Sequence, residues 1–179
     1  MLRPAVPADG PGITAVTAAG FATYASFAPP GWEGPADMTD HRVAERLERP
    51  SAWGVVAEED GRIVGFGAFE QARRDGPDGP LLDGLAHVWA VFVAPSHWGA
   101  GVARAILAAL HDEIGRQGYP EARLYTPAGQ ARARRFYARE GWSERGEPFP
   151  VAALGLDLVE LRRATRPSGS TTPAAAARP

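Results

Sequence analysis

The feature that most constrains this chain is a glycine-containing turn between an apolar strand and an amphipathic helix. Residues 85–94 are mostly apolar and long enough for a buried strand, and Pro95 ends that run. The turn at 96–101 follows, and from Val102 onward apolar residues recur at helical spacing. A strand that leads directly into a helix indicates a sheet covered by helices, as in α/β and α+β domains.

The turn itself suggests chemistry. The first turn of a helix carries unpaired N–H groups and the positive end of the helix dipole. Gly99 and Gly101 would let a phosphate approach this backbone closely, so the segment favours pyrophosphate binding. A plain tight turn explains the glycines equally well. Two other phosphate loops are excluded, because no Gly-Lys-Ser/Thr is present and Arg104 stands where a dinucleotide fingerprint requires its third glycine.

Hydrophobic periodicity predicts the other elements around this turn. Asp60-Gly61 is a strong hairpin signal because glycine tolerates a positive φ. In chain order we expect helices at 13–27 and 43–47, paired strands at 53–57 and 63–69, a loop at 71–83, a strand at 85–94, a helix at 102–114, a strand at 122–126, a helix at 130–140, and strands at 142–145 and 154–161. This order predicts an α/β (α+β) domain around a mixed sheet.

The C-terminal segment differs in composition from the rest. Residues 165–179 consist of Ser, Thr, Pro, Ala, Gly and Arg, without a large apolar side chain. Such a segment cannot bury enough surface to offset the entropy of ordering. We therefore predict one domain at 1–164 and a disordered tail at 165–179.

Composition narrows the classes of partner. The net charge of −2 argues against electrostatic capture of nucleic acid. The absence of cysteine excludes disulfides, thiolate metal ligands and a cysteine nucleophile, and no histidine or aspartate spacing predicts a metal site. The longest mostly apolar stretch, 85–95, is too short to span a bilayer, and no signal peptide is visible. We expect a cytoplasmic protein without a membrane partner.

Residues 89–107 resemble motif A of the GCN5-related N-acetyltransferase (GNAT) superfamily. That motif is Gln/Arg-x-x-Gly-x-Gly/Ala, preceded by a strand that ends in apolar-x-Val-x-Pro. Gly101 and Ala103 match its Gly and Gly/Ala positions, whereas Trp98 stands where Gln or Arg is usual. The substitution weakens a side-chain role in phosphate binding and leaves the backbone role intact.

Residues 130–142 resemble motif B of the same superfamily, Asn-x-x-Ala-x-x-Phe-Tyr followed by Gly-Phe/Trp. Gln130 replaces the Asn, and the other positions fit: Ala133, Phe136, Tyr137, Gly141 and Trp142. The two motifs occur in the right order, and the looser resemblance extends from about residue 2 to residue 163. Together they are far more specific than either motif alone.

The resemblance implies a mostly antiparallel sheet in which the strand at 91–93 parts from the strand at 124–126. The pantetheine arm of acetyl-coenzyme A would lie in that gap and pair with the backbone near Val91 and Val93. A backbone N–H there would polarise the thioester carbonyl. The expected cofactor-binding residues are Val91, Phe92, Val93, Trp98, Gly99, Ala100, Gly101, Val102, Ala103, Arg104, Gln130, Ala133 and Phe136.

Two residues are the candidates for proton transfer. By resemblance Tyr137 is the general acid that assists the departing thiolate, and the alternative is an aromatic packing residue. His87 shares a strand face with Trp89, Val91 and Val93 if alternation is regular, at a position where relatives often have Glu. It is a candidate to act on the acceptor amine, and the alternative is a structural histidine.

The resemblance implies an N-acetyltransferase that moves an acetyl group from acetyl-coenzyme A to an amine, expected on a small molecule, by direct attack without a metal. Two alternatives stay open. One is acetylation of a protein N-terminus or lysine, and the other is a noncatalytic acyl-coenzyme A sensor. Dimers are common among similar proteins, so a homodimer is one expected assembly.

Overall fold

The structure is a computed structural model, and it describes residues 1–35, 39–74, 76 and 78–165. Its helices are α1 (Gly10–Ala22), α2 (Asp40–Leu47), α3 (Val102–Arg116) and α4 (Ala131–Arg139), with short 3-10 turns η1 (Pro7–Asp9), η2 (Thr23–Ser26) and η3 (Pro95–His97). Its strands are β1 (Leu2–Pro4), β2 (Trp53–Glu59), β3 (Arg62–Arg73), β4 (Leu81–Val93), β5 (Glu121–Pro127), β6 (Ser143–Val151) and β7 (Leu156–Ala164). None of these helices is long and apolar enough to cross a membrane.

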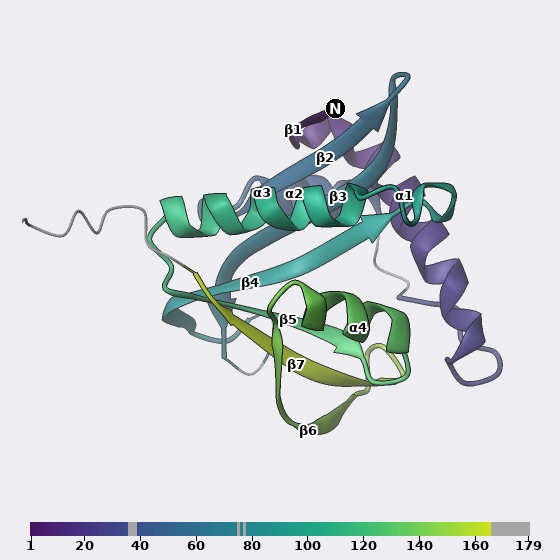
Figure 1. Cartoon of the computed structure of the whole chain (residues 1–179), viewed down its shortest axis with the longest axis vertical. Coiled ribbons are helices and arrows are strands. Elements are labelled where there is room, and N and C mark those ends of the chain that lie inside the picture. Colours follow the sequence, from purple (N-terminus) through teal and green to yellow (C-terminus); the bar gives the residue numbers. More distant parts are fainter. Residues whose placement is uncertain (36–38, 75, 77, 166–179) are drawn as a thin grey trace, which may run out of the picture.

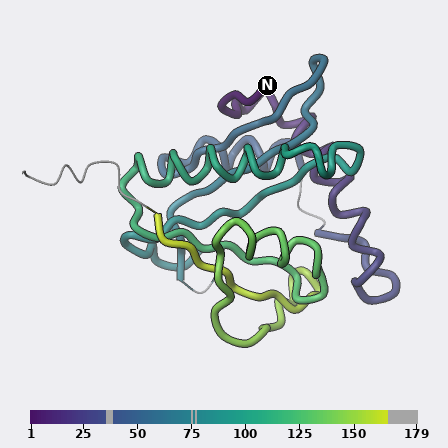
Figure 2. The backbone as a smooth tube through the Cα atoms, viewed as in Figure 1, coloured from purple at the N-terminus to yellow at the C-terminus, as the bar shows by residue number. Residues whose placement is uncertain are grey.

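The seven strands described here form one sheet in the order β1-β2-β3-β4-β5-β7-β6 (Figures 1 and 2). The pair β4 and β5 is parallel, and the other neighbouring strands pair antiparallel. The polypeptide between β4 and β5 crosses over as η3 and α3, as a parallel connection requires. The predicted mixed, mostly antiparallel sheet is confirmed.

Helices cover both faces of the sheet. α3 and α4 lie on one face, and α1 and α2 lie behind the sheet in the view of Figure 1. The larger core cluster joins the sheet to α3 and α4 and includes Ile106, Leu110 and Tyr137. The smaller cluster joins the sheet to α1 and α2 and includes Ile13 and Val43. The sheet is therefore a shared floor for two cores, as in a layered α/β domain.

Small residues set how closely α3 approaches the sheet. A Cβ placed on Gly67 of β3 would lie only 2.4 Å from Cγ2 of Ile106, so a larger residue there would push α3 outward. Ile106 has no exposed surface. The N-terminus of α3, and the turn that precedes it, are thereby held against the end of β4.

Most predicted elements are confirmed, but several bounds differ. The helix predicted at 13–27 ends as α1 at Ala22 and is followed by η2, and the strand predicted at 142–145 extends to Val151 as β6. The hairpin turns at Asp60 and Gly61, whose φ values are 49° and 72°. The predicted loop at 71–83 is wrong at both ends, because β3 continues to Arg73 and β4 begins at Leu81. Polar residues pair there through the backbone, which hydrophobic periodicity does not detect. The three-residue strand β1 was not predicted, since it is too short to show alternation.

The structure also sharpens a prediction about the tail, of which residues 166–179 lie outside the described residues. Thr165 is buried, its N–H donates to the Pro120 carbonyl (2.9 Å), and its hydroxyl donates to the Tyr119 carbonyl. Truncation after residue 166 should therefore leave the melting temperature and ligand affinity unchanged, because the residues removed include no large apolar side chain. Truncation after Ala164 should lower the melting temperature by several degrees, in line with the loss of about 1 kcal/mol per hydrogen bond. Thermal unfolding of both proteins tests this, and destabilisation by the shorter deletion would contradict it.

Candidate active site

The parallel pair at the centre of the sheet separates along its length. β4 and β5 are in register from Leu85 opposite Glu121 to Val88 opposite Leu124. Beyond Val88, β4 pairs only with β3, and beyond Leu124, β5 pairs only with β7. A wedge-shaped gap therefore opens between the C-terminal halves of the two strands, as the resemblance implied.

The β4 side of this gap is an open hydrogen-bonding edge. The N–H of Ala94 donates to the Val64 carbonyl (2.9 Å), so Ala94 directs its backbone toward β3. Because successive residues of a strand direct their backbone groups to alternate sides, Val93 and Val91 face the gap. The indole Nε1 of Trp98 donates to the Val93 carbonyl (2.9 Å), which agrees with this orientation. An extended ligand rich in amides could pair with this edge.

The glycine turn lies at the wide end of the gap. Gly99 and Gly101 have φ values of 87° and 84°, in the region that favours glycine. A Cβ on either residue would meet no atom within 4 Å, so open space lies in front of both. Gly101 caps α3 without a side chain, and the first helical bond runs from the Ala105 N–H to its carbonyl (3.0 Å). In the part of the chain that is described, the N–H groups of 102–104 have no backbone acceptor, which is the arrangement of an anion site.

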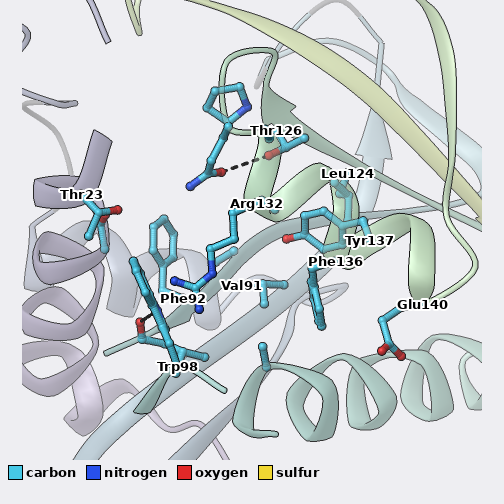
Figure 3. A pocket seen from close by; sticks show the side chains of 18 of the residues that line it. Thr23, Val91, Phe92, Trp98, Leu124, Thr126, Arg132, Phe136, Tyr137 and Glu140 are labelled. Atoms are coloured by element: carbon cyan, nitrogen blue, oxygen red, sulfur yellow. Dashed lines mark hydrogen bonds between the residues drawn. The ribbon is translucent and has the colours of Figure 1, made fainter. Parts of the chain in front are cut away.

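One cavity of about 850 Å³ unites the gap and the turn (Figure 3). Nearly all the predicted cofactor-binding residues line it: Val91, Phe92, Val93, Trp98, Gly99, Gly101, Val102, Ala103, Arg104, Gln130, Ala133 and Phe136. Ala100 and His87 do not. The structure thus brings together segments from two sequence motifs that lie about thirty residues apart.

Tyr137 of α4 also lines the cavity, and its hydroxyl points into it (Figure 3). The residue is 8% exposed. Burial raises the pKa of its phenol well above the ordinary value of 10, with a further increase from the nearby Tyr24. The phenol is therefore protonated near neutral pH, and it can donate a hydrogen bond or a proton.

Two polar residues of the cavity wall were not predicted from sequence. Tyr24 falls within the helix predicted at 13–27, but it belongs to η2 and lines the cavity, where burial raises its pKa to about 12. A hydrogen bond with Gln130 partly offsets that rise. The Thr126 hydroxyl donates to Oε1 of Gln130 (3.2 Å, Figure 3). Gln130 is thereby held between η2 and β5, where the family has Asn.

An irregularity in β4 changes the geometry near His87. Ala68 of β3 pairs with Ala90, but the next residue of β3, Phe69, pairs with Val88. Trp89 is therefore an extra residue, a β-bulge that restarts the alternation of side chains. Bulges often occur beside active sites, and this one lies where β4 leaves β5.

The bulge overturns part of the prediction for His87. We predicted one shared face for His87, Val91 and Val93, and this is wrong. Val91 and Val93 pack in the cluster beneath α3, whereas His87 points to the opposite face, where its ring lies 5.2 Å from that of Tyr125. Regular alternation would have placed the three together, but the extra residue reverses the order after Trp89.

Electrostatics also distinguish His87 from an ordinary base. Burial, then the charges of Arg123 and Arg46, lower its pKa to about 3, so the ring is neutral throughout the physiological range. In the unfolded chain the His87 ring would be protonated below about pH 6.5, whereas in the folded chain it is protonated only below about pH 3. Stability from this site is thus complete above pH 6.5 and declines as the pH falls toward 3.

This difference gives a prediction for stability. When the pH falls from 7 to 5, the free energy of unfolding of the wild-type protein should decrease by about 2 kcal/mol because of His87. This amount follows from the difference between the pKa of His87 in the folded and unfolded chains. His87→Gln removes the titration and should reduce the acid sensitivity by that amount. Urea unfolding at the two pH values measures it. His111, whose pKa burial lowers to about 4, stays in both proteins as an internal control. Equal pH dependence in both proteins would show that His87 is not held neutral by the fold.

The acidic side chains near the site have assigned partners. Glu70 is buried and accepts hydrogen bonds from Arg46 (2.5 Å) and Arg49 (3.1 Å), which fastens α2 to β3. Glu140 lines the main cavity on the α3 side, 3.8 Å from Arg104. Two arginines already engage the Glu70 carboxylate, so Glu70 is a structural residue.

A second cavity of about 440 Å³ adjoins the first. Phe27, Pro127 and Gly129 line both of them, so the two are neighbours at the end of β5. The wall of the second cavity is mostly apolar, and its charged residue is Asp157. Phe27 is the aromatic residue of this wall.

The site combines four features: a separated parallel strand pair, an open backbone edge, a helix N-terminus that can bind an anion, and a protonated phenol. This combination defines a class of acyl-coenzyme A-dependent acyltransferases. The sequence model of the acetyltransferase (GNAT) family matches residues 21–142, more than half of the chain. The chain belongs to this family, and it is an acyltransferase. The predicted family and fold are confirmed.

Solved structures agree with this assignment. The putative acetyltransferase yncA of Salmonella typhimurium, solved with its cofactor acetyl-CoA, has 25% identity and a TM-score of 0.69, over 92% of each chain. The PaiA N-acetyltransferase of Thermoplasma acidophilum, in complex with coenzyme A, has 15% identity and a TM-score of 0.71, over 89% of this chain and 96% of that one. The ribosomal-protein-alanine N-acetyltransferase of Brucella melitensis has 24% identity and a TM-score of 0.69, over 92% and 99%. No curated protein sequence matches significantly.

Proposed function

We propose that this protein transfers the acetyl group of acetyl-coenzyme A to the amine of a small molecule, by direct attack within a ternary complex. The observation that carries the proposal is the continuity of the main cavity, from the N-terminus of α3 along β4 to the hydroxyl of Tyr137. The yncA structure with acetyl-CoA bound supports the choice of acyl donor. The absence of cysteine excludes an acyl-cysteine intermediate and fits direct attack.

Each part of the cavity has a task. The N–H groups at the start of α3 bind the pyrophosphate, and the Val91 and Val93 backbone pairs with the pantetheine amides. The amine attacks the thioester carbonyl, a C–N bond forms, and the C–S bond breaks. The departing thiolate takes a proton from the Tyr137 hydroxyl. The amine loses a proton to solvent, and Tyr137 then takes a proton from solvent, so the hydroxyl is restored.

The second cavity is our candidate for the acceptor site. It adjoins the wide part of the gap through Phe27 and Pro127, so an amine held there can reach the cofactor. Its apolar wall favours an acceptor with an apolar body, and the carboxylate of Asp157 would attract the ammonium form. His87 lines neither cavity and points to the opposite face from Val91 and Val93, so it has no role in this proposal, and the proton of the amine passes to solvent.

Release of free thiol from acetyl-coenzyme A, measured across a panel of amines, tests the function. The panel pairs polar with apolar members: polyamines and aminoglycosides, amino acids with small and large apolar side chains, arylalkylamines, and peptides. We expect turnover with compact apolar amines. Turnover restricted to peptides would identify a protein acetyltransferase. Tight binding of acetyl-coenzyme A without turnover on any member would identify an acyl-coenzyme A sensor and refute the proposal.

A further inference from the structure

An arginine and a tryptophan meet across the mouth of the main cavity. The guanidinium carbon of Arg132, in the first turn of α4, lies 3.7 Å from the centre of the Trp98 ring. Both residues line the cavity, and Figure 3 shows the guanidinium spread over the indole. The two residues are 34 positions apart in the sequence and come from different motifs, so only the fold brings them together.

The indole is fixed at its other end. Its Nε1 donates to the carbonyl of Val93, the last residue of β4 (2.9 Å). This hydrogen bond orients the Trp98 indole between the end of the strand and the glycine turn. A cation on this ring gains attraction from it and loses little of its ability to donate hydrogen bonds, because the edge of the guanidinium stays free.

Arg132 also differs from its neighbour on the same helix. Arg134 donates to Glu144 (2.6 Å) and to the Ala128 carbonyl (3.0 Å), so its charge is already engaged. Within the residues that the structure describes, Arg132 has its ring contact and no carboxylate within ion-pair distance. It is an exposed cation at the mouth of a cavity whose inner end is an anion site.

We infer that Arg132, held on the ring of Trp98, is the side chain that binds the pyrophosphate of the acyl donor. The inference rests on the proposed function and goes beyond it. Position 98 is where the family motif carries Gln or Arg on the turn itself. Here the turn carries an indole, and the positive charge reaches the same place from α4. Trp98 acts as a positioning residue, and Arg132 as a binding residue.

The position of the Trp98 indole favours the pyrophosphate as the group that Arg132 binds. The Trp98 indole is hydrogen-bonded to the end of β4, and Trp98 lies three residues before Gly101, the cap of α3, close in the chain to the free N–H groups of 102–104. A phosphate bound by those N–H groups lies next to the guanidinium. The 3′-phosphate of coenzyme A lies on the ribose, beyond the pyrophosphate, and would need a cation further from the gap.

Calorimetry with three ligands tests this assignment. Coenzyme A has both phosphate groups, dephospho-coenzyme A lacks only the 3′-phosphate, and pantetheine lacks both. Arg132→Ala should weaken coenzyme A and dephospho-coenzyme A equally, by about 10–100-fold, as for one lost hydrogen bond to a charged group. Pantetheine, at its weaker affinity, should bind both proteins alike. Arg135→Ala is the matched control, since Arg135 is an exposed arginine of the same helix that does not line the cavity.

A second pair of variants tests the positioning role of Trp98. Trp98→Ala should weaken coenzyme A binding, and Arg132→Ala should cost less in that background than in the wild type, because the unsupported guanidinium is no longer aimed. Trp98→Phe keeps a ring but loses the hydrogen bond to Val93, so its affinity for coenzyme A should lie between those of the wild type and Trp98→Ala.

Three results would overturn the inference. A loss in Arg132→Ala that disappears with dephospho-coenzyme A would place the contact on the 3′-phosphate. Equal effects of Arg132→Ala and Arg135→Ala would reduce the contribution to general charge. Additive effects of the Trp98 and Arg132 changes would remove the positioning role. Failure of the wild-type protein to bind coenzyme A would instead defeat the proposed function, and the inference with it.

Discussion

Replacement of Tyr137 by phenylalanine is expected to lower turnover by about 10²–10⁴-fold, the usual contribution of general-acid catalysis. The substitution keeps the ring that packs against Trp142 and Phe136, and it removes only the hydroxyl in the cavity. Burial raises the pKa of this phenol, so the wild-type residue is protonated and ready to donate. Without it the thiolate must leave with its negative charge uncompensated. Steady-state rates with a competent amine, at saturating acetyl-coenzyme A, measure the effect.

The controls separate chemistry from binding and packing. The dissociation constant of coenzyme A should change little in Tyr137→Phe. Tyr119→Phe removes a hydroxyl at a site where the ring packs on Phe69, outside the cavity, and should leave the rate unchanged. Because the pKa of Tyr137 is raised, the wild-type rate should show no decline from its ionisation below about pH 10. A wild-type rate in Tyr137→Phe, with chemistry shown to limit turnover, would make Tyr137 a packing residue.

Gly101→Glu is expected to abolish cofactor binding, with a loss of about 100-fold or more in affinity. The carboxylate would enter the open space in front of the turn, where the phosphates must sit, and like charges repel strongly there. The φ of 84° adds strain of about 1–2 kcal/mol for any residue other than glycine. Calorimetry with coenzyme A measures the loss, and circular dichroism checks that the fold persists.

A second glycine corrects for the strain. Gly118 follows the other end of α3, has a φ of 85°, and likewise has open space before its Cβ. Gly118→Glu therefore introduces the same charge and the same strain away from the cavity. It should lower the melting temperature about as much as Gly101→Glu and leave coenzyme A affinity intact. If folded Gly101→Glu protein binds coenzyme A normally, the turn does not hold the pyrophosphate.

Local patterns predicted much of this molecule. The apolar run at 85–94, the glycine turn and the helical spacing after Val102 each depend on neighbours in sequence, and all three elements are confirmed. The separation of β4 from β5 was predicted only through the family resemblance, since no residue pattern in either strand states where pairing stops. The turn residues were placed on the cavity wall for the same reason.

Other features depend on contacts that sequence periodicity does not encode. The bulge at Trp89 adds one residue without a glycine or proline to mark it, so it reversed the predicted face of His87 relative to Val91 and Val93. The helix predicted at 13–27 includes Tyr24, but α1 ends at Ala22, and Tyr24 lies in the following turn and lines the cavity. Local turn geometry decided these cases, and it cannot be obtained from hydrophobicity alone.

The contact between Trp98 and Arg132 lies at the same limit. In sequence, Trp98 was a departure from a motif, and Arg132 was one of several arginines on a helix. Only the fold brings the two residues together, because the guanidinium of Arg132 lies on the ring of Trp98. The sequence motifs therefore located the site, whereas this contact is visible only in the structure.

Transfer of an isotopically labelled acetyl group tests the central claim most directly. The protein is incubated with labelled acetyl-coenzyme A, with and without the best amine of the panel, and the label is located by mass spectrometry. We predict that the label moves to the amine in step with the release of free coenzyme A, and that the intact mass of the protein is unchanged in both samples. Label retained on the thioester in the presence of every amine tested, or label attached to the protein as an intermediate, would contradict a direct acetyl transfer in this cavity.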